Sequence, residues 1–353
     1  MAGGDIAHYI GDADKGRDAA CRVFTDGFHT PVLLEEALDF LDVQPGEKYI
    51  DATVGGGGHT AVILEKRGIV LGIDQDSAAV EAAQKKLAAE FPAPNIKYQI
   101  LNTRYRIVQG NFKNVDEIAE DHGSDEVRGV LYDLGMSSWQ LENSGRGFSF
   151  LKDEPLDMRM DPALSVKAED LLNGLTEKEL DELFSKFAQE KRSRAIARAC
   201  VGARNIRPIK TTQELSGLLA WVELGERGDF WDWYTGTFSK DPDRFGNYDR
   251  RARIFQALRT VVNDELNNLK ISLPRAARLL KPLGRLVVIS FHSLEDAVVK
   301  GFGKDGRPSY AKASEGKPLM KSLTKKPVRP SVEEIRENPR ARSARLRAFE
   351  RTR

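Results

Sequence analysis

Four consecutive glycines, Gly55 to Gly58, constrain most strongly what this chain can fold into. An apolar run ending at Asp51 precedes them, and residues 60–64 begin a helix-like pattern. A strand that enters a glycine turn and continues into a helix lets the backbone approach a ligand where side chains would collide. Asp74 ends a second apolar run about 20 residues on, where an acidic side chain can accept hydrogen bonds from ribose hydroxyls. The pattern favours an adenosine-containing ligand over a tight loop without one.

The glycine spacing differs from the dinucleotide fingerprint. When Gly-x-Gly-x-x-Gly is read from Gly55, the third glycine position falls on Thr60, and the acidic Asp51 comes just before the turn. An acidic residue at this place attracts an ammonium group and repels a pyrophosphate. The sequence therefore predicts S-adenosylmethionine as the cofactor, in preference to a nicotinamide or flavin dinucleotide.

Composition sets broader limits. The 353 residues have room for two domains, and 54 Lys and Arg against 53 Asp and Glu give no overall sign of a nucleic-acid binder. The charges are unevenly placed, because residues 317–353 hold 12 Lys or Arg and 4 Glu, which reads as a basic tail. A charged terminus that is merely solvated would have the same composition.

Localisation and metal binding are judged from absences in the sequence. Cys21 and Cys200 form no pattern, which suggests a reducing compartment, and the five histidines show no metal-ligand spacing. No apolar run approaches about 18 residues, so we expect no membrane span. Residues 1–28 lack the features of a targeting signal and are expected to be a flexible extension of a cytoplasmic protein.

Strand and helix patterns alternate through the first part of the chain. Apolar runs end at Asp51, Asp74, Gln109 and Leu134, with helical patterns between them, including one over residues 77–90. This alternation predicts a parallel sheet, in which ligands lie at the carboxyl ends of the strands. Asp51, Asp74, Phe112 and Asp133 all fall at such ends. Phe112 is placed to cover an adenine ring, although an ordinary core phenylalanine would fit the position as well.

The alternation stops for about 120 residues and then resumes. Helical patterns are expected over residues 167–173, 177–186, 191–203 and 212–219, the third with a basic side that a solvated helix would also show. The aromatic stretch 225–247 has no periodicity. A helix over 252–269, continued by 273–280, and an apolar strand over 285–290 complete the sheet. The middle region is therefore an insertion into one α/β domain.

Several sequence blocks together resemble one family, the bacterial ribosomal RNA methyltransferases that methylate the exocyclic N4 of a cytidine in small-subunit RNA. The resemblance covers nearly everything from His29 to Arg347. Its blocks are residues 29–34, 51–60, 133–138, 146–150, 156–161, 255–259, 290–296 and 337–343. Departures occur at Trp139, where the family usually has a small residue or Pro, and at residues 249–253.

The resemblance implies the fold, the site and the partner. The fold would be α/β, a Rossmann-like class I S-adenosylmethionine-dependent methyltransferase with an inserted helical domain that recognises RNA. Residues 29–150 plus 255–353 would form the methyltransferase domain, and residues 151–254 the insertion. Small-subunit ribosomal RNA or the small ribosomal subunit would be the partner; the oligomeric state stays open, with a homodimer as one option. The implied cofactor-binding residues are Gly57, Gly58, His59, Asp74, Phe112, Asp133 and Gln140.

Methyl transfer from a sulfonium is an in-line displacement, so the enzyme mainly has to align the methyl group with the nucleophile. The cytosine amine is conjugated into its ring, and acceptors for its N–H groups, reached by flipping the base out of any stack, would favour attack. We expect these acceptors in the loop 133–138, with Asp157 and the turn 290–293 as outside candidates, and assign no single catalytic residue. The alternatives are a small-molecule methyltransferase and a non-catalytic RNA-binding assembly factor on the same fold.

Overall fold

The computed structural model describes residues 31–92, 104–137, 140–141, 144–225, 228–237, 247–305 and 319–353. The extension expected over residues 1–28 lies outside these ranges, as do Trp139 and Cys21. Among the described residues, no helix has the length and apolar character needed to cross a membrane.

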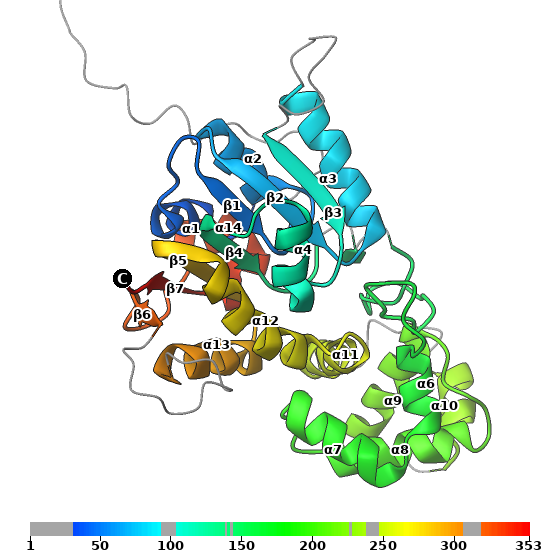
Figure 1. The fold of residues 1–353 in the computed structure, drawn as a ribbon. Coiled ribbons are helices and arrows are strands. Elements are labelled where there is room, and N and C mark those ends of the chain that lie inside the picture. Colours follow the sequence, from blue (N-terminus) through cyan, green and yellow to red (C-terminus); the bar gives the residue numbers. More distant parts are fainter. Residues whose placement is uncertain are drawn as a thin grey trace, which may run out of the picture.

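A seven-stranded sheet with the order β3-β2-β1-β4-β5-β7-β6 forms the centre of the molecule (Figure 1). The strands are β1 (Lys48–Asp51), β2 (Ile69–Asp74), β3 (Tyr105–Gln109), β4 (Val127–Asp133), β5 (Leu280–Ser290), β6 (Met320–Ser322) and β7 (Arg345–Arg351). The first five strands pair in parallel, while β7 runs antiparallel to both β5 and β6. The parallel order 3-2-1-4-5 is that of a doubly wound Rossmann sheet, so the expected fold class is confirmed.

Helices cover both faces of this sheet. The apolar sides of α1 (Leu34–Leu41), α2 (Gly58–Glu65) and α3 (Ser77–Glu90) pack on one face. On the other face lie α4 (Val115–Asp121), α12 (Glu265–Leu279) and α13 (Ser293–Asp305). Strands covered on both sides must be apolar throughout, which is why they read as uninterrupted hydrophobic runs in the sequence.

The basic C-terminal segment is largely part of the sheet. In β7 the side chains of Leu346, Ala348 and Phe349 are buried, and Arg347 donates from Nε to Asp296 Oδ1 at 2.7 Å. The interpretation of residues 317–353 as a basic tail is therefore wrong for this strand. Arginines alternate with the apolar residues here, and their charge hides a strand pattern of period two.

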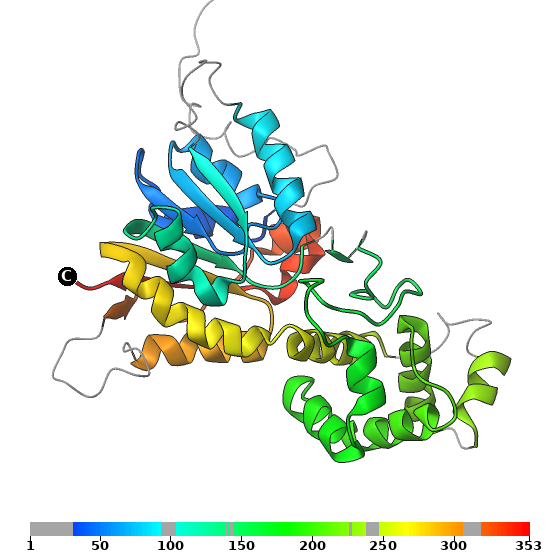
Figure 2. The ribbon, with the colours of Figure 1, turned by 45° about the vertical axis from the view of Figure 1, so that its right-hand side comes forward.

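Within the described ranges, six helices form a separate body, which we call the helical unit: α6 (Ala168–Gly174), α7 (Glu177–Phe187), α8 (Ser193–Arg204), α9 (Thr212–Leu224), α10 (Phe230–Gly236) and α11 (Tyr248–Val262). Their apolar side chains form one cluster that begins at Phe148 and ends at Val262. Figure 2 shows this unit beside the sheet, joined to it where α11 is followed by α12. The boundary predicted at residue 254 falls inside α11, and the domain limits remain a prediction.

The single helix expected over residues 252–269 is wrong. The chain breaks after Val262, because Asp264 has a left-handed φ of 49° and α12 begins only at Glu265. The Asn263 side chain stabilises this break by donating to the carbonyl of Met158 at 2.8 Å and accepting from the amide of Met160 at 2.7 Å. These partners lie about 100 residues away in the chain, so local periodicity could not reveal the break.

Candidate active site

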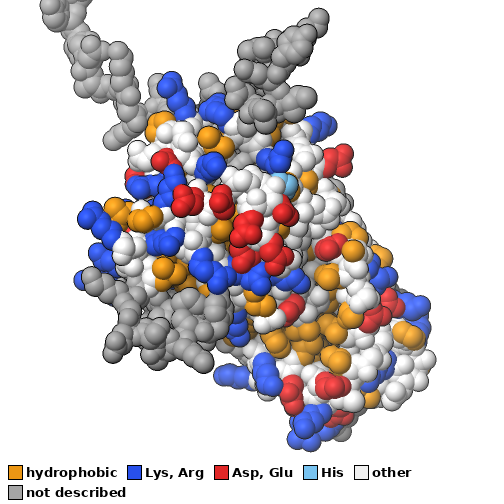
Figure 3. Space-filling view, viewed as in Figure 1, with side chains coloured by type: hydrophobic (Ala, Val, Ile, Leu, Met, Phe, Trp, Pro, Cys, Tyr) orange, Lys and Arg blue, Asp and Glu red, His pale blue; other side chains and the backbone are white. Residues whose placement is uncertain are grey.

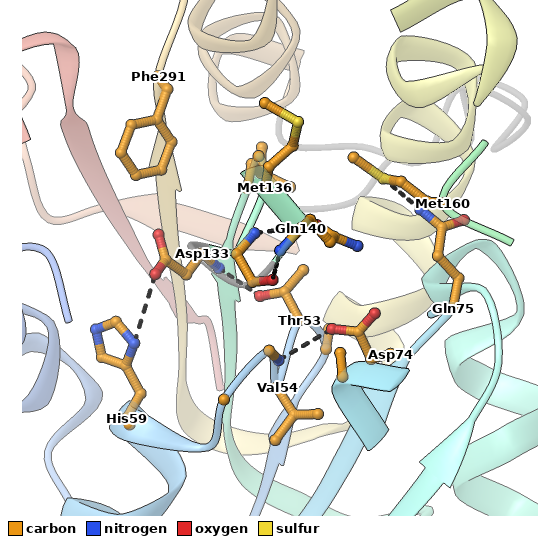
Figure 4. Close-up of a pocket in the computed structure, with 18 of the residues that line it drawn as sticks. Thr53, Val54, His59, Asp74, Gln75, Asp133, Met136, Gln140, Met160 and Phe291 are labelled. Atoms are coloured by element: carbon orange, nitrogen blue, oxygen red, sulfur yellow. Dashed lines mark hydrogen bonds and ion pairs between the residues drawn. The ribbon is translucent and has the colours of Figure 1, made fainter. Parts of the chain in front are cut away.

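A cavity of about 500 Å³ opens at the carboxyl ends of β1, β2 and β4 (Figure 4). It is lined by Gly58, His59, Asp74, Phe112, Asp133 and Gln140, which are all the predicted site residues except Gly57. The parallel topology explains the convergence, because strand ends that are far apart in sequence share one edge of the sheet.

The glycine turn requires glycine at two positions for different reasons. Gly57 caps α2 with a left-handed φ of 77°, a conformation that side chains with a Cβ rarely adopt. Gly58 has no such angle, but a Cβ there would come within 2.5 Å of Pro31 Cγ. Gly57 thus shapes the turn from outside the cavity, while Gly58 allows Pro31 to close one wall of it.

Asp74 is held at the end of β2 by two backbone amides. Its Oδ2 accepts from Gly55 N and its Oδ1 from Asp76 N, both at 2.9 Å. A carboxylate has about four acceptor positions, so two remain for a ligand. Burial raises the pKa of Asp74 to about 6 despite these bonds. The side chain is therefore fixed, faces the cavity and is costly to keep ionised without a ligand.

Two further carboxylates, Asp51 and Asp133, lie at the ends of β1 and β4. Burial raises the pKa of Asp51 to about 6, although Thr60 Oγ1 donates to its Oδ2 at 2.7 Å. Burial also raises the pKa of Asp133 well above its ordinary value, with added repulsion from Asp51 and Glu295. His59 Nδ1 lies 3.6 Å from Asp133 Oδ2 (Figure 4). Asp133 Oδ1 is buried and has no hydrogen-bond partner among the described residues. Such a concentration of buried acidic groups suits a cationic ligand.

Gln140 is anchored within the protein at both ends of its amide. It donates from Nε2 to Asp76 Oδ2 at 2.7 Å and accepts at Oε1 from the amide of Ser137 at 3.0 Å. Arg146 pairs with the same Asp76 oxygen. Asp76 was not expected from the sequence, because it caps α3 as any helix-capping aspartate would. It fixes the loop after β4 against the end of β2.

Phe112 lies in a short 3-10 helix (Phe112–Asn114) directly after β3 and is only partly buried. Its ring contacts that of Tyr132 edge to face, with 5.7 Å between centroids. The hydroxyl of Ser272 donates to the backbone carbonyl of Phe112 at 2.6 Å. The ring is therefore held in place while part of it remains available to the cavity.

The other end of the cavity contains five residues that the sequence does not single out, although Met136 belongs to the expected acceptor loop 133–138 and Phe291 to the candidate turn 290–293. Met136, Arg259, Glu265, Phe291 and Glu295 line it, beside Asp133. Figure 4 shows Phe291 and Met136 on the same side of the Asp133 carboxylate. The blocks 255–259 and 290–296 are family motifs in the sequence, but their spacing does not predict that they line the same cavity.

Three of the groups near this end, Glu265, His292 and Glu295, lie close enough to share a metal ion. Their charges already have partners, because Arg259 binds both oxygens of Glu265 and His292 Nε2 lies 3.1 Å from Glu295 Oε1. Burial alone would raise the pKa of Glu295, but the His292 hydrogen bond and the charges of His292 and Arg259 lower it. Glu265 and Glu295 thus each have a close partner within the protein.

Other candidates from the sequence have structural roles. Asp157 does not line the cavity, since both its oxygens accept from the guanidinium of Arg159 at 2.7 and 2.8 Å. Cys200 is buried in the helical unit, and burial raises the pKa of its thiol to about 12. The basic side of α8 is partly used internally: Arg192 and Arg204 donate to backbone carbonyls, and Arg198 Nε lies 3.7 Å from Glu177 Oε1. Arg194 and Arg198 are exposed to solvent.

The fold and the cavity together define an S-adenosylmethionine-dependent methyltransferase, the class expected from the sequence. Comparison with known families is more specific: residues 26–352 match the model of the MraW methylase family, and the chain belongs to that family. The family prediction is thereby confirmed.

Two curated relatives show how far the similarity extends. A protein from Thermomicrobium roseum is 43% identical over 335 residues, covering 92% of this chain and 93% of that protein. One from Syntrophobacter fumaroxidans is 41% identical over 332 residues, covering 91% and 96%. Both are named ribosomal RNA small subunit methyltransferase H. Among solved structures, a putative rRNA-methylase from Clostridium thermocellum aligns over 92% of this chain and 99% of its own, with 13% identity and a TM-score of 0.40.

Proposed function

We propose that this chain transfers a methyl group from S-adenosylmethionine to the exocyclic N4 of a cytidine in small-subunit ribosomal RNA. The observation that carries the proposal is the cavity in which Asp74 and Asp133 meet the glycine turn, with Asp51 buried at the adjoining end of β1, in a chain of the MraW methylase family. The names of the relatives support the RNA substrate.

The cofactor contacts follow from the groups present. The two remaining acceptor positions of Asp74 would receive the ribose hydroxyls, and the ring of Phe112 would cover the adenine. Asp133 would face the ammonium and sulfonium groups, and Asp51 would act on them from its buried position at the end of β1; the positive charges of the cofactor favour both ionised carboxylates. When bound, the cofactor supplies an electrophilic methyl group.

The protein then has to align the acceptor amine with that methyl group. Asp133 Oδ1, which has no partner among the described residues, would accept one N–H of the amine and so direct its lone pair. The base must be flipped out of any stack to reach this position. A general base before transfer is unnecessary, because the methylated amine loses its proton readily.

RNA binding would involve the helical unit, for which we propose the limits 148–262 of its apolar cluster. Exposed Arg194 and Arg198 on α8 would contact phosphates. The face drawn in Figure 3 mixes signs: acidic side chains gather over α4, where Asp116 pairs with Arg275 and Arg278 of α12. Contact with RNA would thus fit the helical unit better than the acidic area over α4. Action in the cytoplasm would follow from the substrate.

The test is chemical identification of the product. Purified protein is incubated with labelled S-adenosylmethionine and small-subunit RNA, either free or in assembled subunits. The RNA is then digested to nucleosides for mass spectrometry. N4-methylcytidine is expected; a methyl group on a ring carbon, a ribose or a purine would refute the assignment, and so would transfer to small molecules alone.

A further inference from the structure

We propose that Arg259 reads the target base, donating a hydrogen bond from its guanidinium to ring nitrogen N3 of the cytosine. The inference rests on the proposed function and adds a specificity-determining residue to it. The residue belongs to a sequence block, 255–259, whose role the cofactor site leaves unexplained.

Arg259 is a buried cation, and one nitrogen of its guanidinium group makes no hydrogen bond to the described residues. It is 7% exposed and lines the cavity from the last turn of α11. Its Nε and Nη2 donate to the two oxygens of Glu265 at 2.7 and 2.8 Å. Its third nitrogen, Nη1, donates no hydrogen bond to any residue within the described ranges. Nη1 is not among the fully buried polar atoms without a partner, so a ligand in the cavity can reach it and accept a hydrogen bond from it.

The break between α11 and α12 creates this arrangement. Residues six apart on a continuous helix point about 120° away from each other, so Arg259 and Glu265 could not form a two-pronged pair. The left-handed Asp264 turns the chain back, and Asn263 fixes the turn by donating to the Arg259 carbonyl at 2.9 Å. The guanidinium plane is thereby fixed by Glu265, as a recognition contact requires.

A complementary acceptor lies at the same end of the cavity. Asp133 Oδ1 is buried without a partner among the described residues, and Glu295 repels Asp133 and attracts Arg259. The site thus presents one cationic donor and one anionic acceptor. Along the pairing edge, cytosine offers an N4–H donor next to the N3 acceptor, whereas uracil offers the O4 acceptor next to an N3–H donor. The pair Asp133 and Arg259 matches cytosine and opposes uracil.

The experiment removes the N3 acceptor from the RNA and its donor from the protein. Wild-type protein is titrated with a small-subunit RNA fragment that contains the unmodified target cytidine. A second fragment carries 3-deazacytidine at that position, in which N3 is replaced by a C–H group. We expect the wild type to bind the deaza RNA about 10- to 150-fold more weakly. In the double variant Arg259→Gln/Glu265→Gln, which leaves neither charge unpaired, the two RNAs should bind alike.

Arg253→Gln is the matched control, because Arg253 lies on the same helix and pairs with Glu190 at 2.7 Å but does not line the cavity. It should retain the wild-type difference between the RNAs. S-adenosylmethionine affinity, measured by calorimetry, should be unchanged in all variants.

Other outcomes would overturn the inference. Equal binding of both RNAs by the wild type would exclude an N3 contact, and this result does not depend on any variant folding. A double variant that still discriminates would make Arg259 a structural residue. If the double variant lost cofactor affinity but still discriminated between the RNAs, Arg259 would instead bind the cofactor carboxylate. If the double variant bound both RNAs equally more weakly, Arg259 would instead contact a phosphate. A failure of the proposed function would be seen separately, as absence of N4-methylcytidine from the wild-type reaction.

Discussion

Replacing Asp51 with Asn should stabilise the ligand-free protein at neutral pH while weakening cofactor binding. Asp51 is 1% exposed, and burial raises its pKa from 3.8 to about 6. A shift of about 2 pKa units corresponds to about 3 kcal/mol of unfolding free energy lost when the group ionises. Asn keeps the carbonyl oxygen and the shape of the side chain, and the Thr60 hydroxyl can then accept where it now donates.

The pH dependence determines the sign of the change in unfolding free energy. Because the pKa of Asp51 is raised in the folded state, this side chain binds more protons in the folded protein than in the unfolded chain between pH 4 and pH 6. Its stabilising contribution is fully present below about pH 4 and is lost as the pH rises through about 6. The difference between Asp51→Asn and wild type should therefore be near zero at pH 4 and reach about 2–3 kcal/mol above pH 7.

Denaturant unfolding monitored by circular dichroism, at several pH values between 4 and 8, measures this difference. Asp39→Asn, which alters an exposed carboxyl on α1, serves as the control and should follow the wild type. A gain that is independent of pH, or a loss of stability at pH 7, would refute the claim that a buried charge is kept here for the ligand.

Four further predictions concern the ligands and the thiol. S-adenosylmethionine affinity should rise as the pH increases from 5 to 7, because Asp51 and Asp74 ionise near pH 6; calorimetry showing a flat profile would contradict it. Asp74→Ala should weaken cofactor binding by about 1.5–3 kcal/mol and loosen the glycine turn, whose Gly55 amide loses its acceptor. Neutralising Arg198 on α8 should lower the salt slope of RNA binding by about one unit, measured by titration at several ionic strengths. Cys200→Ala should retain methyl transfer in a labelled-methyl assay, since the thiol is buried away from the cavity.

Much of the cofactor half of the site was determined by the sequence alone. The ends of β1, β2 and β4 could be read because buried parallel strands are continuous apolar runs, and an acidic residue marks each end. The glycine turn indicated a close backbone approach, since glycine there meets a local requirement of backbone angle and space, and Asp74 and Asp51 then indicated the ligand class.

Only the tertiary structure decided the other half. β7 was hidden because its arginines find their partners elsewhere, as Arg347 does with Asp296. The break before α12 depends on Asn263 bonding to a loop about 100 residues earlier, and it alone turns Glu265 onto Arg259. Periodicity reports how residues lie along one element, whereas a contact between distant elements leaves no periodic trace in either of them. That is why the sequence could predict that Asp74, Phe112 and Asp133 lie near one another, whereas it could not predict the pairing of Arg259 with Glu265.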